Sequence, residues 1–196
     1  MITDIRLAGQ QLAAPRFDTP KKLISWMGAI QAQDYAMARW AVGIRLKSAT
    51  ARSVGEAFSR GEILRTHVMR PTWHLVAAED IRWMLKLSAR RIRSANESLA
   101  KGRQLELTEQ LHYRCDRLLE KMLGGNRNLT KQQIGEELNR QGIAADTPRL
   151  TRLLMRAETE AVVCSGPFSG GKQTYALLEE RVPPVPELHP DEALAK

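Results

Sequence analysis

The sequence predicts a mainly α-helical protein that carries small β-hairpins. Three observations lead to this fold class: apolar residues recur at helical spacing along much of the chain, two β-rich stretches are each divided by a turn signal, and helices followed by a hairpin occur in both halves. The 196 residues, 43% of them apolar, are enough to bury a core. We therefore expect a globular protein.

Three helices and a hairpin are predicted in the first half. The helices are expected over residues 3–14, over residues 20–33 and after Ser53. Thr19 can cap the second helix, because its hydroxyl can accept a hydrogen bond from a backbone N–H of the first turn. Two β-rich runs, residues 62–69 and 72–77, then meet at the Arg70-Pro71 turn.

The second half repeats this plan. Thr130 can cap a helix that Gly142 ends, and Asp146 can cap the helix TPRLTRLLMRAETE. AVVCSGPFSGGKQTYALL then reads as two strands around a glycine-rich tip. Helix, short turn, helix and hairpin is the winged-helix arrangement, a helix-turn-helix variant whose second helix can enter the major groove of DNA.

The predicted organisation is therefore two winged-helix modules in tandem. Residues 1–100 form the first module with a connecting helix, residues 101–185 form the second, and residues 186–196 begin a following segment. Longer connecting helices are expected from AAEDIRWMLKLSARRIRSANESLAKG and from residues 105–123. A short helix beginning at Asp191 would be a fragment of a longer one.

The net charge of +8 lies in the first half of the chain. Residues 1–100 hold 16 lysines and arginines against 8 acidic residues, whereas residues 101–196 hold 14 of each. A basic half of this kind is typical of proteins that face a polyanion, because each neutralised phosphate releases counterions. A basic surface that only keeps the protein soluble is the alternative.

Several classes of protein are not supported by the sequence. No run of eighteen apolar residues and no secretory leader is present, so a cytoplasmic protein without membrane contact is expected. Cys115 and Cys164 form no CxxC pair, and buried thiols are expected. His112 and Cys115 have no second ligand pair, which argues against zinc. GPFSGGKQ resembles a phosphate-binding loop, but Gln173 stands where a hydroxyl is required.

Basic residues form the predicted DNA-binding surface. On the second helix of the second module three arginines fall within about 60° of one another, and the connecting helix repeats the pattern. Their side chains can donate to phosphates or guanine edges, although a solvated charged face explains such stripes equally well. The stripes consist of Arg149, Arg152 and Arg156 and of Arg82, Lys86 and Arg93, while Arg65, Arg70 and Lys172 add cations on the hairpins.

Gln31 and Gln33 are the candidate catalytic residues. A carboxamide is a poor general base near neutral pH, but two carbonyl oxygens can accept hydrogens from an attacking water and face positive charge on a sugar. This suits a leaving group that is already activated, such as a nucleobase alkylated at a ring nitrogen. Two helix-end amides that bond to the backbone are the simpler interpretation.

The stretches IQAQD, EILRTHVMRPTWHLVAAEDIRWML and KQTYALLEERVP resemble the AlkZ-like winged-helix DNA glycosylases over nearly the whole chain. The resemblance implies a bacterial base-excision enzyme that removes N-alkylated purines and, in some members, unhooks interstrand crosslinks, with neither metal nor nucleotide cofactor. The family's glutamine, apolar residue, glutamine motif corresponds to Gln31, Ala32 and Gln33. The implied partner is double-stranded DNA, alkylated or crosslinked, and the implied place is the nucleoid.

One departure from the family concerns length. Family members have a third winged helix and a small β-barrel beyond the second module, and this chain ends where those would start. We therefore expect the 196-residue form to fold but to bind DNA weakly, with poor or absent glycosylase activity.

Two other classes of function remain open on the sequence. A non-catalytic winged-helix protein, for instance a transcription regulator, would use Arg149, Arg152 and Arg156 for groove contacts. A structural or protein-interaction module would fit the neutral second half of the chain.

Overall fold

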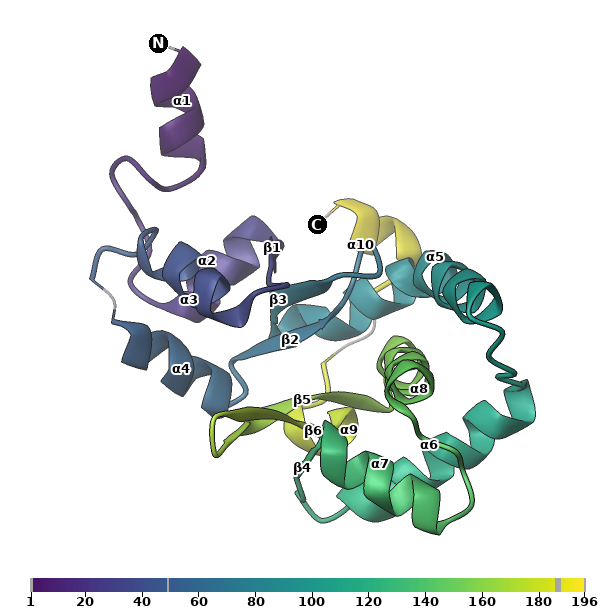
Figure 1. The fold of residues 1–196 in the computed structure, drawn as a ribbon. Coiled ribbons are helices and arrows are strands. Elements are labelled where there is room, and N and C mark those ends of the chain that lie inside the picture. The colour runs from purple at the N-terminus through teal and green to yellow at the C-terminus, as the bar shows by residue number, and fades with distance from the viewer. Residues whose placement is uncertain (1, 49, 186–187, 196) are drawn as a thin grey trace.

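Two three-stranded antiparallel sheets, each accompanied by helices, organise the structure (Figure 1). The structure is a computed structural model that describes residues 2–48, 50–185 and 188–195. The side chains of residues 190 and 194 are outside the description.

The first half contains the sheet with strand order β1-β3-β2. Its elements are α1 (Ile2–Gly9), α2 (Pro20–Met27), β1 (Ala29–Gln31), α3 (Tyr35–Gly43), α4 (Ala51–Ser59), β2 (Ile63–His67), β3 (Trp73–Ala77), the short helix η1 (Ala78–Asp80) and the long helix α5 (Ile81–Gly102).

The second half contains the sheet with strand order β4-β6-β5. Its elements are α6 (Glu109–Leu123), β4 (Leu129–Thr130), α7 (Lys131–Arg140), α8 (Thr147–Thr159), β5 (Val163–Ser169), β6 (Lys172–Leu177), α9 (Leu178–Arg181) and α10 (Pro190–Ala195). Within each half, a helix, a strand, two helices and two strands follow one another, and the third strand lies in the middle of the sheet. One order of elements therefore occurs in both halves, although the prediction lacked the third strand of each sheet.

Both predicted hairpins and several helix caps are present. Thr19 accepts a hydrogen bond from the backbone of Lys22, and Asp146 accepts one from the backbone of Arg149. Thr130 forms a reciprocal capping box with Gln133. These short polar side chains satisfy N–H groups that have no partner inside the helix, which explains why their helices begin where the sequence predicts.

The prediction of one helix over residues 20–33 is wrong. α2 ends at Met27, and Gly28 has a φ of +72°, a conformation open to glycine but unfavourable for other residues. Ala29–Gln31 then pairs with β3 as an edge strand. The helix expected over residues 3–14 likewise ends early, at Gly9, because Gln11 leaves the helical region with a φ of 56°.

The sequence analysis also missed α3. Asp34 caps this helix through the backbone N–H of Met37. Only Ala38 and Val42 are buried on it, while Met37 and Trp40 are exposed. Because small residues face the core and large apolar ones face solvent, the helical pattern is hard to recognise.

The two halves pack against each other through aromatic residues as well as strands. Phe168, near the tip of the second hairpin, packs against Tyr35 and Phe58 of the first half, with ring centroids 4.6 and 5.3 Å apart. A further apolar cluster joins β2, β3 and α5 to Cys164 and Leu178. The second hairpin is therefore anchored in the first half of the protein.

Helix α8 lies between α5 and α6 (Figure 1), and every residue from 153 to 159 is buried. The sequence analysis assigned it the part of a DNA-reading helix. A helix whose last two turns are enclosed by the protein has no free face there to enter a groove, so α8 acts chiefly as a core element. Within the described ranges, no helix is long and apolar enough to cross a membrane.

Replacement of Phe168 by alanine should lower the free energy of unfolding by about 2 kcal/mol, less than for a fully buried phenylalanine because this ring is only half-buried. Urea denaturation measures the change. Tyr113→Ala, at a side chain 68% exposed, is the matched control and should change stability by less than about 0.5 kcal/mol. Equal effects of the two substitutions would show that the hairpin tip does not hold the halves together.

Candidate active site

Gln31 and Gln33 lie at the edge of the first sheet. Gln31 is the last residue of β1 and stands opposite His74, and the N–H of Ala32 continues the pairing by donating to the carbonyl of Trp73 at 2.7 Å. Both glutamines are exposed, whereas Ala32 between them is fully buried. β1 ends at Gln31 and Gln33 lies in the bend that follows, so the exposed, buried, exposed order at the end of the strand brings both carboxamides to the surface.

The carboxamide oxygens of the two glutamines have different partners. Oε1 of Gln31 accepts a hydrogen bond of 2.6 Å from the guanidinium of Arg70, which belongs to the turn between β2 and β3. Oε1 of Gln33 accepts a longer one, 3.3 Å, from the backbone N–H of Trp73. Each oxygen retains a second lone pair, and among the described residues neither carboxamide nitrogen donates a hydrogen bond.

Arg65 of β2 holds the backbone of the motif in place. Its Nε donates to the carbonyl of Ala32 at 2.9 Å, and its Nη2 donates to the carbonyl of Gln33 at 3.0 Å. Its Nη1 reaches Oε1 of Gln173 on β6, and the guanidinium stacks on the ring of Trp73, 4.6 Å from the centroid. One side chain therefore fixes the glutamine segment to both sheets.

Burial lowers the pKa of Arg65, but an arginine remains charged at any physiological pH. Its backbone N–H also donates to the hydroxyl of Ser165 on β5 at 2.8 Å, which ties the two sheets together at the same residue.

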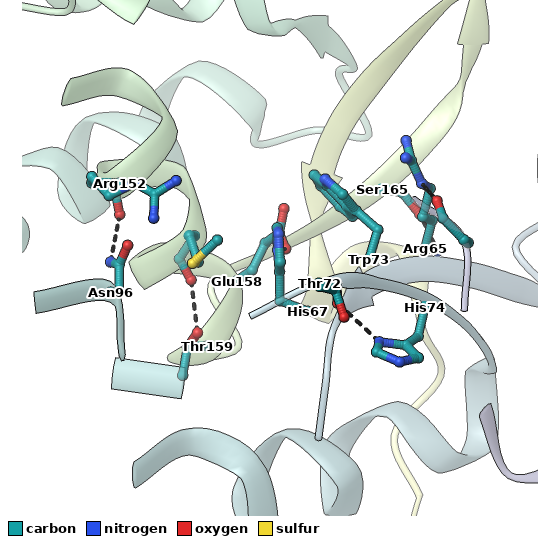
Figure 2. A network of polar contacts seen from close by, with 12 residues as sticks. Arg65, His67, Thr72, Trp73, His74, Asn96, Arg152, Glu158, Thr159 and Ser165 are labelled. Carbon is teal, nitrogen blue, oxygen red and sulfur yellow. Dashed lines mark hydrogen bonds and ion pairs between the residues drawn. The ribbon is translucent and has the colours of Figure 1, made fainter. Parts of the chain in front are cut away.

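His74 lies beneath the glutamines on the middle strand. As the cross-strand partner of Gln31 it occupies the same face of the sheet, opposite to the face of Trp73 (Figure 2). It is 4% exposed, and its Nδ1 lies 2.9 Å from the carbonyl of Thr72. Burial, the main cause, lowers the pKa of His74 below its ordinary value, so the ring is neutral at neutral pH.

The predicted arginine stripe on α8 does not form at the surface. Arg156 is only 8% exposed and makes ion pairs of 2.9 Å with Glu109 and 2.8 Å with Glu160. A buried guanidinium that already pairs with two carboxylates of the protein is not available to a phosphate. We therefore leave Arg156 out of the DNA contacts proposed below.

The other two arginines of that helix are also engaged. Arg149 donates to the carbonyl of Glu106 at 3.0 Å, and burial lowers the pKa of the half-buried Arg152. The backbone carbonyl of Arg152 accepts a hydrogen bond from Asn96 of α5 (Figure 2). These contacts attach α8 to its neighbours.

The cations predicted on α5 and on the hairpins differ in how they are placed. Arg82 pairs with Glu179 at 2.9 Å, and Arg93 pairs with Glu160 at 2.6 Å. Lys86, Arg70 and Lys172 are exposed. Of the nine predicted basic residues, the structure brings only Arg65 and Arg70 into contact with the glutamine motif.

A buried pair of charged or ionisable side chains was missed by the sequence analysis. Nδ1 of His67 on β2 lies 2.6 Å from Oε2 of Glu158 on α8, and both side chains are almost fully buried (Figure 2). The ring of His67 also stacks on that of Trp73, with centroids 4.1 Å apart. Because 91 residues separate the partners, no local spacing in the sequence signals this pair.

A cavity of about 270 Å³ lies beside this pair. Its walls include Arg65, His67, Trp73, Lys131, Glu158 and Tyr175. Two of these, Arg65 and Trp73, also contact Gln33, so the cavity and the glutamine motif share a wall.

The cysteines are buried thiols, as the sequence predicts. Burial raises the pKa of both Cys115 and Cys164 to about 12, which keeps them unreactive. In the part of the chain that the structure describes, no three His, Cys, Asp or Glu side chains gather closely enough to hold a metal ion.

Arg65→Lys should lower the free energy of unfolding by about 2 kcal/mol, because a single ammonium cannot replace the fork that donates to three acceptors. Chemical denaturation measures the effect. The control is Arg52→Lys, at an arginine whose side chain is 88% exposed, which should cost less than about 0.5 kcal/mol. A cost at Arg65 no larger than at Arg52 would contradict the proposed clamp.

His74→Gln should alter the pH dependence of stability. Because the pKa of His74 is lowered in the folded protein, the unfolded chain binds the proton at higher pH, and the wild type should lose stability relative to the variant as the pH falls below 6.5. Denaturation curves between about pH 5 and pH 8 measure this difference. The exposed His189→Gln variant should follow the wild type, and a difference at His74 that does not change with pH would refute the assignment.

Comparison with known proteins identifies the family. Residues 24–196 match the family described as DNA glycosylase AlkZ-like. None of the curated proteins matches the chain. Among solved structures, Streptomyces sahachiroi DNA glycosylase AlkZ is similar in fold, with 23% sequence identity and a TM-score of 0.73 over 96% of this chain. The chain spans 52% of that protein, about half its length. The resemblance stated from the sequence is thus confirmed, and the chain belongs to the AlkZ-like DNA glycosylase family.

Proposed function

We propose that this protein is a DNA glycosylase that hydrolyses the N-glycosidic bond of purines alkylated at a ring nitrogen. The observation that carries the proposal is the pair of exposed carboxamides, Gln31 at the end of edge strand β1 and Gln33 in the segment that follows, whose backbone is held by Arg65. Family membership supports the reaction class. The exposure of the two carboxamides and their contacts with Arg70 and the backbone of Trp73 support their assignment as site residues.

The chemistry uses the charge of the substrate. In a purine alkylated at a ring nitrogen, the glycosidic electron pair moves onto the base as the bond breaks, and this neutralises the positive charge of the base. The sugar becomes cationic, and a water oxygen forms the new bond at its anomeric carbon. The carboxamide oxygens orient this water and stabilise the sugar charge, and the released proton passes to solvent.

Arg70 links the site to the DNA backbone in this proposal. It is exposed, and in the free protein it occupies one lone pair of Oε1 of Gln31. A phosphate is a stronger acceptor for a guanidinium than a neutral carboxamide is. Binding of DNA would draw Arg70 toward the phosphate and release the oxygen of Gln31 for water or for the sugar.

Further phosphate contacts are proposed for residues on the same basic half of the chain and on the second hairpin. Lys86 and Lys172 are exposed, and Arg82, Arg93, Arg149 and Arg152 lie at the surface only in part.

We infer that both halves are winged-helix modules, because each repeats one order of elements and one hairpin strand pairs with the shorter strand.

Unhooking of interstrand crosslinks that have cationic linkages would be an extension of the same chemistry.

A non-catalytic winged-helix DNA-binding protein is the second candidate. The basic first half of the chain favours it, since such a surface binds DNA whether or not a reaction follows. The burial of α8 argues against the usual mode of winged-helix DNA binding, in which the second helix of a module contacts the bases in the groove.

Gln31→Ala and Gln33→Ala should each slow the release of 7-methylguanine from duplex DNA by at least about 100-fold, because removal of one positioned transition-state contact commonly has this effect. Released base is measured under single-turnover conditions with the 196-residue chain.

Gln132→Ala, at an exposed glutamine on α7, is the matched control and should leave the rate unchanged. Circular dichroism checks that each variant is folded. If both site variants release the base as fast as the wild type does, the assignment of the catalytic residues is wrong. Protection of one defined DNA sequence without any base release would instead support the regulator.

A further inference from the structure

We infer that the cavity beside the glutamine motif is a binding pocket for a single purine base with both hydrogen-bond donor and acceptor edges, such as guanine. The biological role of this pocket rests on the proposed glycosylase function, whereas the binding of a base follows from the residues of the cavity.

An unpartnered carboxylate oxygen points to a ligand. Glu158 is fully buried, and its Oε2 bonds to His67, but its Oε1 has no hydrogen-bond partner among the described residues. A buried carboxylate oxygen without a donor is costly, so its persistence at a cavity wall indicates that a donor from outside the chain completes it. An N–H group on the edge of a purine is such a donor.

The cavity is suited to a flat heterocycle. Its volume of about 270 Å³ lies below the roughly 300–1,000 Å³ of pockets that hold drug-sized ligands, so a base fits better than a whole nucleotide. Trp73 and Tyr175 contribute aromatic rings to its walls. Enzymes that act on extruded bases commonly stack them on aromatic side chains and bond to their edges.

The cavity wall also contains hydrogen-bond donors. Lys131 Nζ donates to the hydroxyl of Thr151 at 2.5 Å and keeps further hydrogens, and Arg65 lines the same wall. Ammonium and guanidinium groups are the usual partners of the carbonyl oxygen of guanine. Glu158 and Lys131 therefore offer an acceptor and a donor to the N–H groups and the carbonyl oxygen of this base.

Two half-buried residues of the cavity wall also contact the motif. His67, Glu158 and Tyr175 are buried, whereas Arg65 and Trp73 are half-buried. These two outer residues also contact Gln33, through its backbone carbonyl and its Oε1 respectively. A base seated against Trp73 would thus leave its sugar at the rim, next to the carboxamide of Gln33.

Direct binding of the released base tests the pocket without any DNA chemistry. Isothermal titration of the 196-residue chain with free 7-methylguanine should show binding, and Glu158→Gln should weaken it by roughly tenfold or more, because an acceptor oxygen is replaced by an NH2 group while the shape is kept. Glu136→Gln, an exposed glutamate on α7, is the matched control and should bind like the wild type. Caffeine is a purine of related shape without an N–H donor. Its affinity for the wild type should be no higher than the affinity of 7-methylguanine for Glu158→Gln.

A second readout covers the case in which Glu158→Gln fails to fold. In the wild type, addition of 7-methylguanine should shift the indole N–H resonance of Trp73 and leave those of Trp26 and Trp40 in place. No binding of 7-methylguanine, equal binding to wild type and Glu158→Gln, or shifts confined to the other tryptophans would overturn the inference.

The two proposals fail separately. Gln31→Ala and Gln33→Ala should still bind the free base within a few-fold of the wild type, because neither side chain lines the cavity in the described structure. Base binding that depends on Glu158, without release of the base from DNA, would support the binding pocket and contradict the proposed glycosylase function. Release of the base from DNA without binding of the free base would support the glycosylase function and contradict the binding pocket.

Discussion

The hydrogen bonds from Arg65 to the segment after β1 are the constraint on which the rest of the site depends. An edge strand of three residues has few hydrogen bonds of its own, and this guanidinium supplies two more to the carbonyls of Ala32 and Gln33. The same side chain reaches Gln173 and stacks on Trp73. A single residue therefore contributes to the position of the carboxamides, to the contact between the two sheets and to one wall of the cavity.

Much of the fold could be predicted from the sequence because its signals are local. The hairpins have a turn at Arg70-Pro71 or at the paired glycines, and the helices of the second half have caps such as Thr130. The boundary of α2 could not be predicted, because LISWMGAI continues the helical pattern past Gly28. Only the hydrogen bonds to β3, a segment more than forty residues later, turn Ala29–Gln31 into a strand.

The candidate site was predictable in its residues but not in its setting. Gln31 and Gln33 stand out in the sequence. Their joint exposure at the end of β1 and their contacts with Arg65 and Arg70 depend on the tertiary fold. The arginines of α8 show the opposite outcome. Their helical spacing is real, but α5 and α6 enclose the helix, so Arg156 neutralises acidic residues of the protein rather than a phosphate. Spacing alone cannot tell which face of a helix remains free.

The central claim is that two neutral carboxamides suffice because the departing base carries its own positive charge. The most direct measurement compares single-turnover release of 7-methylguanine with that of hypoxanthine, a neutral base, from otherwise identical duplexes by this protein. The account predicts that 7-methylguanine is released at least about 100-fold faster. Comparable rates for the two bases would contradict it, because the protein would then have to supply an acid that Gln31 and Gln33 cannot provide.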